Sequence, residues 1–438
     1  MRTLTAASYE ELRRRHLADM TAMTAEAVER IDWPAERLAV HRRTMLRHLL
    51  VIACQRSLWH RERLGAVAVG GLDEDGLAAL PVMTKSDLME NFDAIVTDRR
   101  LSLDLVESHL STLTGDAYLL DRYHAVASSG TSGMRGVFVY GWEAWALFYL
   151  SLRRHSLRSL AAESARATAP IVVAKLGAQR ALHPSRAIAQ TFADAWEVIH
   201  SFPVTMPTEQ LVDELNRLQP AVLEGYSSTL YQLVSEARSG RLRIAPRRVA
   251  AISEPLLPEI RSALAQAWGV PVMNTWATSE GGGCAASCGT APAMHLSEDL
   301  LIIEPVDADG APTRPGIPSA KVYLTNLYNP TLPLIRYEIT DEVRVLDQRC
   351  TCGSVHRLID DIHGRLDDSF RYGHLTVHPH VFRSALGGHR HVIEYQVHQT
   401  ARGANLAVRC REGADLAGLR AQLVAEWRGW GWRIPRWR

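Results

Sequence analysis

The segment from Glu209 to Glu280 decides the fold. It reads EQLVDELNRLQPAVLEGYSSTLYQLVSEARSGRLRIAPRRVAAISEPLLPEIRSALAQAWGVPVMNTWATSE. The spacing of its apolar residues predicts helices over 209–218, 229–238 and 258–268, and short apolar runs predict strands over 171–174, 222–223, 249–252 and 270–273. Strands and helices that alternate in this way form a largely parallel sheet, so the sequence predicts an α/β fold.

Three polar segments follow the expected strands directly. They are Glu224-Gly-Tyr-Ser, Ser253-Glu-Pro and Trp276-Ala-Thr-Ser-Glu. Because ligands of parallel α/β sheets bind at the carboxyl ends of the strands, these segments predict a binding site.

The flanking regions have a different character. The chain is expected to be mostly helical up to about residue 105, with a helix entry at Ser86, and β-rich from about residue 300, with strands over 300–304, 321–326 and 343–346. A final unit of about seventy residues has an expected strand over 392–397 and an amphipathic helix over 415–427.

The composition narrows the class of protein. The chain has 438 residues, 47% of them hydrophobic, and a net charge of +1, which argues against a nucleic-acid-binding chain and against long disordered segments. Its N-terminus carries charges where a signal peptide needs an apolar run, and no apolar stretch is long enough to span a membrane, so a cytoplasmic protein is expected. Only three of the 49 basic residues are lysines: Lys85, Lys175 and Lys321.

A loop rich in Ser, Thr and Gly precedes the apolar run Val137-Phe-Val-Tyr140. It includes Ser128, Ser129, Gly130, Thr131, Ser132 and Gly133, whose N–H and hydroxyl groups can surround phosphate oxygens. The loop lacks the Gly-Lys-Ser/Thr of a Walker loop. Alone, it is equally consistent with a plain polar hairpin loop.

Four of the six cysteines cluster in the sequence. Cys350 and Cys352 are spaced to reach one tetrahedral ion, and Cys284, Cys288 and His295 offer more ligands than the two still needed. The expected set is Cys288, His295, Cys350 and Cys352, with Cys284 as the alternate. The competing interpretation is a group of free buried cysteines.

These segments together resemble the adenylate-forming superfamily, which includes acyl-CoA synthetases and the adenylation domains of peptide synthetases. The 128–133 loop resembles its phosphate loop, Ser253-Glu-Pro255 its adenine-side Gly-Glu-Pro turn, and Trp276-Ala-Thr-Ser-Glu280 its aromatic-Gly-x-Thr/Ser-Glu segment, with Ala277 in place of Gly. Arg336-Tyr-Glu-Ile-Thr-Asp341 resembles its ribose-binding segment, and Gly364-Arg-Leu-Asp-Asp368 its interdomain hinge. Five matches in the family's order are far more specific than any one of them.

The phenylacetate-CoA ligase-like subgroup resembles this chain most closely, over roughly residues 40 to 400. The similar segments are Leu80-Pro-Val-Met-Thr-Lys-Ser-Asp-Leu, Pro333-Leu-Ile-Arg-Tyr and Cys350-Thr-Cys-Gly-Ser-Val-His-Arg. This resemblance implies a structural Zn²⁺ at the cysteine cluster. It also implies a large N-terminal domain, residues 1–364, with a parallel sheet and a β-rich subdomain, and a small, shortened, mobile C-terminal α+β domain, residues 365–438.

The resemblance implies that ATP activates a carboxylic acid to an acyl-AMP, with release of pyrophosphate, before transfer to a thiol such as CoA. The 128–133 loop would hold the pyrophosphate side, Glu280 would bind Mg²⁺, and Ser279 would reach the α-phosphate. Asp341 would accept both ribose hydroxyls, Arg365 would contact ribose or phosphate, and Asp367 would be the hinge. The mundane alternatives are a surface acid for Glu280, a turn residue for Asp341 and a salt-bridge partner for Arg365.

Aromatic side chains near the expected strand ends suit a flat, apolar acid. Trp145, Tyr226, Trp276 and Ala277 are the candidate pocket residues, although core packing explains aromatic residues equally well. The expected partners are the acid and ATP, with a homodimer and a carrier protein as further expectations.

One feature departs from the family pattern. The family usually carries a lysine in its small domain, but no lysine follows Lys321 in this chain. Two other functions therefore stay open: adenylation with an amine, a carrier protein or a small inorganic nucleophile as acceptor, and a non-catalytic nucleotide-binding homologue.

Overall fold

The computed structural model describes most of the chain up to residue 362 and parts of the remainder. The described residues are 6–65, 67, 71–128, 136–164, 171–177, 184–193, 197–204, 206–362, 370–372, 375–377, 392–401, 403–410, 415, 417–418 and 420–421.

The helices are concentrated in the first 270 residues. They are α1 (Ala6–Glu29), the 3-10 helix η1 (Arg30–Asp32), α2 (Ala35–Arg56), α3 (Leu58–Leu64), α4 (Glu74–Leu77), α5 (Lys85–Glu90), α6 (Phe92–Ile95), α7 (Leu103–Thr112), α8 (Trp142–Ser164), α9 (Pro184–Thr191), α10 (Thr208–Leu218), α11 (Ser227–Arg238) and α12 (Pro258–Trp268). The mostly helical N-terminal region is therefore confirmed.

The strands form one large sheet and several small ones. They are β1 (Tyr123–Ala127), β2 (Val137–Gly141), β3 (Ile171–Gly177), β4 (Glu197–Pro203), β5 (Val222–Gly225), β6 (Arg248–Ala251), β7 (Val272–Thr278), β8 (Gly282–Ser287), β9 (Met294–Leu296), β10 (Leu301–Val306), β11 (Lys321–Asn326), β12 (Tyr337–Ile339), β13 (Leu358–Ile359), β14 (Phe370–Tyr372), β15 (Leu375–Val377), β16 (Val392–Thr400) and β17 (Gly403–Cys410).

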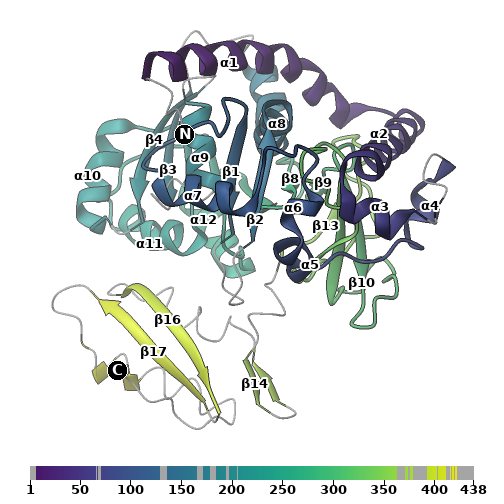
Figure 1. Ribbon diagram of the computed structural model, residues 1–438. Coiled ribbons are helices and arrows are strands. Elements are labelled where there is room, and N and C mark those ends of the chain that lie inside the picture. Colours follow the sequence, from purple (N-terminus) through teal and green to yellow (C-terminus); the bar gives the residue numbers. More distant parts are fainter. Residues whose placement is uncertain are drawn as a thin grey trace.

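An eight-stranded sheet in the order β13-β9-β8-β7-β6-β5-β3-β4 forms the centre of the molecule (Figure 1). Strands β4, β3, β5, β6 and β7 run parallel, whereas β8, β9 and β13 continue the sheet in antiparallel fashion. The predicted α/β fold with a largely parallel sheet is confirmed. Its antiparallel continuation after β7 was not predicted.

Helices α10, α11 and α12 cover one face of the parallel strands. Their Leu215, Leu230 and Leu264 are fully buried in one apolar cluster with Leu223 of β5 and Val249 of β6. Each helix stops where the sequence predicts: α10 ends at a left-handed Gln219 before Pro220, and α12 ends at a left-handed Gly269. This packing fixes the carboxyl ends of the strands.

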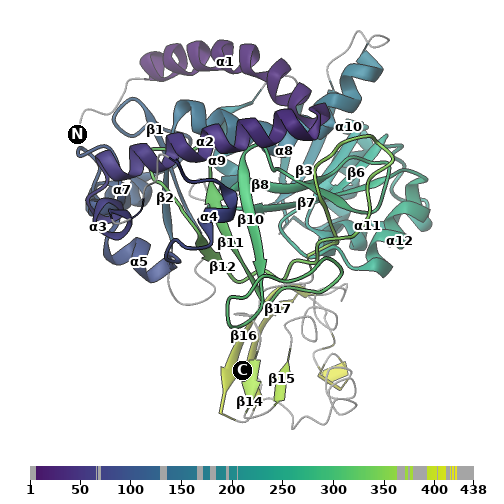
Figure 2. The same ribbon diagram turned by 90° about the vertical axis from the view of Figure 1, so that its right-hand side faces the viewer.

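A hairpin and a three-stranded sheet flank the central sheet (Figure 2). The hairpin is β1–β2, with Ala127 opposite Val137, so it connects through the Ser- and Gly-rich loop. The antiparallel sheet β10-β11-β12 is the β-rich region expected after residue 300. Helix α1 crosses the top of the molecule in both views and packs against α8.

Two local expectations are wrong. Residues 343–346 form no strand, because only Val345 pairs there, in an isolated bridge with Ile359. Helix α5 begins after Thr84 rather than at Ser86, since Thr84 and Asp87 form a capping box. The predicted helix over 415–427 falls largely outside the described residues.

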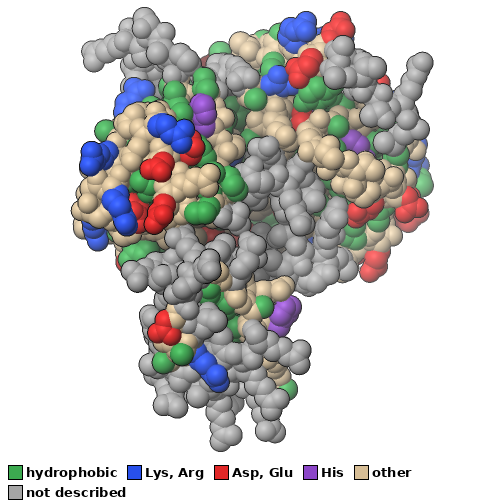
Figure 3. All heavy atoms as spheres, turned by 90° about the vertical axis from the view of Figure 1, so that its left-hand side faces the viewer, with side chains coloured by type: hydrophobic (Ala, Val, Ile, Leu, Met, Phe, Trp, Pro, Cys, Tyr) green, Lys and Arg blue, Asp and Glu red, His purple; other side chains and the backbone are tan. Residues whose placement is uncertain are grey.

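None of the helices in the described part of the chain combines the length and the apolar character needed to cross a membrane. On the face shown in Figure 3, basic and acidic side chains are interspersed over the coloured surface.

Candidate functional site

The hairpin β1–β2 closes the base of the Ser- and Gly-rich loop. The Ser128 amide donates to the Gly136 carbonyl at 2.9 Å, and the Gly136 amide donates to Ser128 Oγ at 2.8 Å. A Cβ at Gly136 would lie 2.9 Å from the Phe138 ring, so a larger residue here requires that ring to shift. Residues Ser129, Gly130, Thr131, Ser132 and Gly133 lie outside the described residues.

The turn between β7 and β8 is held from several sides. Tyr140 of β2 donates its hydroxyl to the Ser279 carbonyl at 2.5 Å. Asn326, at the end of β11, donates to the Glu280 carbonyl at 2.9 Å, and Tyr328 donates to the Gly281 carbonyl at 3.0 Å. The turn that carries Ser279 and Glu280 therefore lies against the hairpin that carries the phosphate-loop candidate.

Backbone conformation explains one of the glycines after this turn, and close backbone contact explains the next. Gly282 has a φ of +68°, in the left-handed region that favours glycine. At Gly283 a side chain would lie 2.7 Å from the backbone of Ser151 in α8. The Gly283 amide instead donates to Ser151 Oγ at 2.8 Å. Helix α8 thus fixes the start of β8.

Glu280 and Asp341 are both buried, with relative exposures of 7% and 3%. The interpretation of Glu280 as a surface acid is therefore wrong. Trp276 donates its indole N–H to Asp341 Oδ2 at 2.7 Å. This bond connects the end of β7 to the segment after β12, which are far apart in the sequence. Burying a carboxylate is unfavourable without donors, and Trp276 supplies one.

The Ser253-Glu-Pro segment turns sharply at the end of β6. Ser253 has a φ of +63°, which is uncommon for any residue other than glycine. Glu254 accepts the Ser228 amide at 2.9 Å, at the beginning of α11. A carboxylate at a helix N-terminus is stabilised by the free N–H groups there. Glu254 thereby ties the β6 turn to the β5 turn, and Pro255 follows it.

The candidate pocket residues differ in burial. Trp145 is fully buried, donates to Thr191 Oγ1 at 3.1 Å and stacks on His124, so core packing accounts for its position. Tyr226 is half-buried at the end of β5, and Ala277 is exposed near the end of β7. Their role in acid binding stays a prediction.

A group of three charged side chains, which the sequence did not reveal, lies on the α8 side of the sheet. Arg153 of α8 donates to Glu224 Oε2 at 2.8 Å, and the ammonium of Lys175 lies 3.3 Å from Glu224 Oε1. Burial alone would raise the pKa of Glu224, but Lys175 and Arg153 lower it overall. The sequence marks Glu224 only as part of a strand end, because a single segment does not reveal which strands pair.

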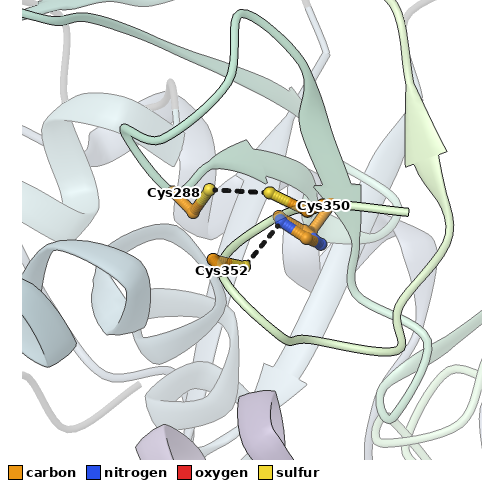
Figure 4. Close-up of side chains that lie close together, drawn as sticks. Cys288, Cys350 and Cys352 are labelled. Atoms are coloured by element: carbon orange, nitrogen blue, oxygen red, sulfur yellow. Dashed lines mark hydrogen bonds between the residues drawn. The ribbon is translucent and has the colours of Figure 1, made fainter. Parts of the chain in front are cut away.

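The four expected metal ligands come together at the far end of the β7–β8 hairpin. One ligand atom from each of Cys288, His295, Cys350 and Cys352 lies within 4.8 Å of all the others. Figure 4 shows Cys288, Cys350 and Cys352 pointing toward one another. The Cys288 and Cys350 sulfurs are 3.6 Å apart, and Cys352 Sγ is 3.4 Å from His295 Nε2.

These distances fit a tetrahedral zinc site. Zn–S and Zn–N bonds of about 2.3 and 2.0 Å give ligand separations of roughly 3.5–3.8 Å in a tetrahedron. His295 Nδ1 lies 3.3 Å from the His356 carbonyl, which directs Nε2 toward the sulfurs. Burial raises the pKa of Cys288, but hydrogen bonds with Thr290 and the other cysteines lower it overall, which favours the thiolate.

Cys284, the alternate ligand, lies elsewhere. It is fully buried in β8, and its sulfur is 3.5 Å from Thr278 Oγ1. Burial raises the pKa of this thiol above its usual value. Cys284 therefore packs beneath the β7–β8 turn and is not part of the four-ligand group.

Two solved structures resemble the chain over most of its length. They are crystal structures of 2-hydroxyisobutyryl-CoA ligase, one in the postadenylation state with R3-HIB-AMP and one in the thioesterification state with 2-HIB-AMP and CoA. The first is 18% identical, with a TM-score of 0.65, and the second 20% identical, with a TM-score of 0.60. Both alignments cover 93% of this chain and 87% of the other. The chain has the fold of the adenylate-forming superfamily.

A curated relative matches a shorter part of the chain. A phenylacetate-coenzyme A ligase of Thermus thermophilus is 32% identical over 131 residues, which are 29% of this chain and 29% of that protein. The match thus spans less than a third of that relative. No protein-family model matches the chain.

The adenylate-forming fold brings two of the subgroup-like segments together. Met83 donates its amide to the Arg336 carbonyl at 3.0 Å and accepts the Glu338 amide at 2.8 Å. Arg365 and Asp367, the predicted nucleotide contact and hinge, lie outside the described residues.

Sequence reasoning missed Tyr140 and Asn326, because a buried hydrogen bond between distant segments leaves no local pattern.

Proposed function

We propose that this protein uses ATP to activate a carboxylic acid and then transfers the acyl group to the thiol of CoA. In the first step the carboxylate oxygen attacks the α-phosphorus of ATP, and the bond to pyrophosphate breaks. The observation that carries this proposal is the contact between Tyr140 of the phosphate-loop hairpin and Ser279 beside the buried Glu280. The likeness to CoA ligases supports it at the level of the fold.

The proposed phosphate contacts come from the two sides of this junction. Ser128 and the loop residues 129–133 would bind the pyrophosphate part, and Ser279 would contact the α-phosphate. Glu280 would ligate Mg²⁺, which prefers carboxylate and phosphate oxygens. When bound, that ion would neutralise charge as two anions meet, and a turn held by three neighbouring side chains would keep Glu280 in place.

The proposed nucleoside contacts lie at the neighbouring strand ends. Asp341 would accept the ribose hydroxyls while Trp276 holds its other side. The Ser253-Glu-Pro turn and Trp276 would border the adenine. Arg365 would contact ribose or phosphate from the hinge segment.

We further propose two units, residues 1–364 and 365–438, with Asp367 as the hinge between them. In this proposal the small unit rotates between acyl-AMP formation and thioester formation. A few backbone torsions are enough for such a rotation.

The acid is proposed to be aromatic, on the partial match to a phenylacetate-coenzyme A ligase and the half-buried Tyr226. Trp145, Trp276 and Ala277 are the other residues proposed to line the acid-binding site. The Cys288, His295, Cys350 and Cys352 group is proposed to hold a structural Zn²⁺, since four protein ligands leave no position for a substrate.

Exchange of labelled pyrophosphate into ATP, measured across a panel of acids, tests the adenylation step. We expect exchange with at least one aromatic acid and a loss of about 100-fold or more in Glu280→Gln. Glu259→Gln, which changes an exposed glutamate of α12, is the matched control. ATP binding without exchange for any acid would refute the proposal and favour a non-catalytic homologue.

Mass spectrometry of the products with and without CoA tests the acceptor. An acyl-CoA product is expected. Release of acyl-AMP alone in the presence of CoA, or transfer to an amine or a carrier protein, would support the adenylation step but refute CoA as the acceptor.

A further inference from the structure

The charged group Lys175–Glu224–Arg153 lies at the edge of the sheet where ligands bind. Lys175 is opposite Glu224 in the pairing of β3 and β5, and both are within two residues of the carboxyl ends of their strands. Glu224 is buried, and the side chains of Lys175 and Arg153 are 15% and 14% exposed. Three charges so far from bulk solvent weaken a fold unless they are well compensated.

The group faces away from the apolar core of the parallel half. Leu223 and Val249 point into the cluster under α10, α11 and α12, so Glu224, which follows Leu223, points to the opposite face, where Arg153 of α8 meets it. Only three of the chain's 49 basic residues are lysines, and one of them occupies this face.

Three small residues between this group and the β7–β8 turn are incompletely buried. Glu224 pairs with Ala250 of β6, which pairs with Met273 of β7. Ala250 and Thr275 are partly exposed and Ala277 is exposed, although all three lie on inner strands of an eight-stranded sheet. Helices usually cover both faces of such strands, so the exposure of Ala250, Thr275 and Ala277 leaves room for a ligand beside them, although Met273 between them is buried.

The ammonium of Lys175 can donate a hydrogen bond to a further acceptor. A lysine ammonium has three donors, and Glu224 is its one ion-pair partner in the described part of the chain. That partner is shared, because Arg153 binds the other oxygen of the same carboxylate. An anionic group of a ligand would fill the remaining donor positions of Lys175.

We propose that the acid activated by this protein carries a second anionic group, at the end remote from the activated carboxylate, and that Lys175 binds this group. The inference rests on the proposed function, because it places the activated carboxylate near Ser279 and Glu280. Three strand spacings of about 4.8 Å separate β7 from β3, so roughly 14 Å of sheet lies between the two ends. A charged far end also gives discrimination, because Lys175 and Arg153 share the single carboxylate of Glu224, and a neutral analogue leaves their excess positive charge uncompensated.

Dicarboxylic acids and their mono-amides are the sharpest probes. The pyrophosphate exchange assay compares adipate, suberate and 4-carboxyphenylacetate, each with the analogue in which the remote carboxylate is a neutral amide. We expect kcat/KM to favour at least one diacid over its own amide by about 10- to 100-fold, as a charge-assisted hydrogen bond predicts. Lys175→Met should remove this preference and leave the amide's kcat/KM within about threefold.

The control is Lys321→Met, which changes a lysine that pairs with Glu338 on the β10-β11-β12 sheet. Thermal unfolding checks that each variant folds. If Lys175→Met does not fold, the comparison of each diacid with its amide in the wild type tests the inference. Equal use of diacids and amides by the wild type, or exchange confined to monocarboxylic acids, would overturn this inference and leave the proposed function standing. Absence of exchange with every acid would overturn both.

Discussion

The two ends of the β7–β8 hairpin are held in different ways. The turn, at Ser279 to Gly281, is fixed by neutral hydrogen bonds from Tyr140, Asn326 and Tyr328. The open end, just after β8, holds three cysteines and a histidine, the group proposed to bind zinc. The turn depends on three hydrogen bonds that remain whenever the fold is intact, whereas the open end would depend, in the proposed zinc site, on ligands that must be deprotonated to bind a metal.

The largest effect is expected at the open end. Cys350→Ser should abolish stoichiometric zinc and lower the free energy of unfolding by more than about 3 kcal/mol, because binding of a structural metal contributes directly to folding. Metal analysis and thermal unfolding measure this. Cys54→Ser, which changes a cysteine of α2, should alter neither. Full stability of Cys350→Ser would show that the four ligands act only by packing.

A smaller effect is expected between the turn and Asp341. Trp276→Phe removes the N–H that Asp341 accepts and should lower the free energy of unfolding by about 1.5–3 kcal/mol, the usual range for a hydrogen bond to a charged group. It should also raise the KM for ATP while the zinc content stays constant. Trp268→Phe, on α12, is the matched control. An unchanged KM for ATP would speak against a ribose role for Asp341.

Tyr140→Phe tests the contact between hairpin and turn. Burial raises the pKa of Tyr140 well above its usual value, so the phenol is a neutral donor. Its loss leaves the Ser279 carbonyl without this partner and should lower the free energy of unfolding by about 1–2 kcal/mol. Pyrophosphate exchange should fall more than this loss of stability explains. Tyr231→Phe, at an exposed position, should have no effect on either measurement.

The smallest effect concerns the strained turn after β6. Ser253 has a positive φ, so Ser253→Gly should be more stable than Ser253→Ala by about 0.5–1 kcal/mol. Comparison of their chemical denaturation midpoints measures this difference. Equal midpoints would mean that the turn relaxes when the side chain changes.

The sequence predicted the features with a local period or a short spacing. The helices over 209–218 and 258–268, the largely parallel sheet and the cysteine–histidine set all belong to this group. Strands β8, β9 and β13 were missed, because runs such as Gly282-Gly-Cys-Ala-Ala-Ser are buried on both faces and show no alternation. The isolated pairing of Val345 had no signal that distinguishes it from a strand.

In the candidate site, too, local motifs could be predicted from the sequence, whereas contacts between distant segments could not. Glu280 and Asp341 could be singled out because they end motifs, but their burial and the bond from Trp276 arise only in the folded chain. The pair of Lys175 and Glu224 depends on the register of β3 with β5, which no single segment encodes. Long-range register is the step at which sequence reasoning stops.

The register of β7 against β8 shifts between Trp276 and Ala277, and this irregularity has a consequence for folding. A slip of β8 by one residue against β7 would exchange the two faces of the strand and move Glu280 away from its neighbours. Cys288 follows β8 by one residue, so binding it to the same ion as Cys350 and Cys352 would select one alignment of the two strands. We therefore expect protein refolded without zinc to recover its helices but to populate shifted alignments, and zinc added afterwards to restore exchange activity only slowly.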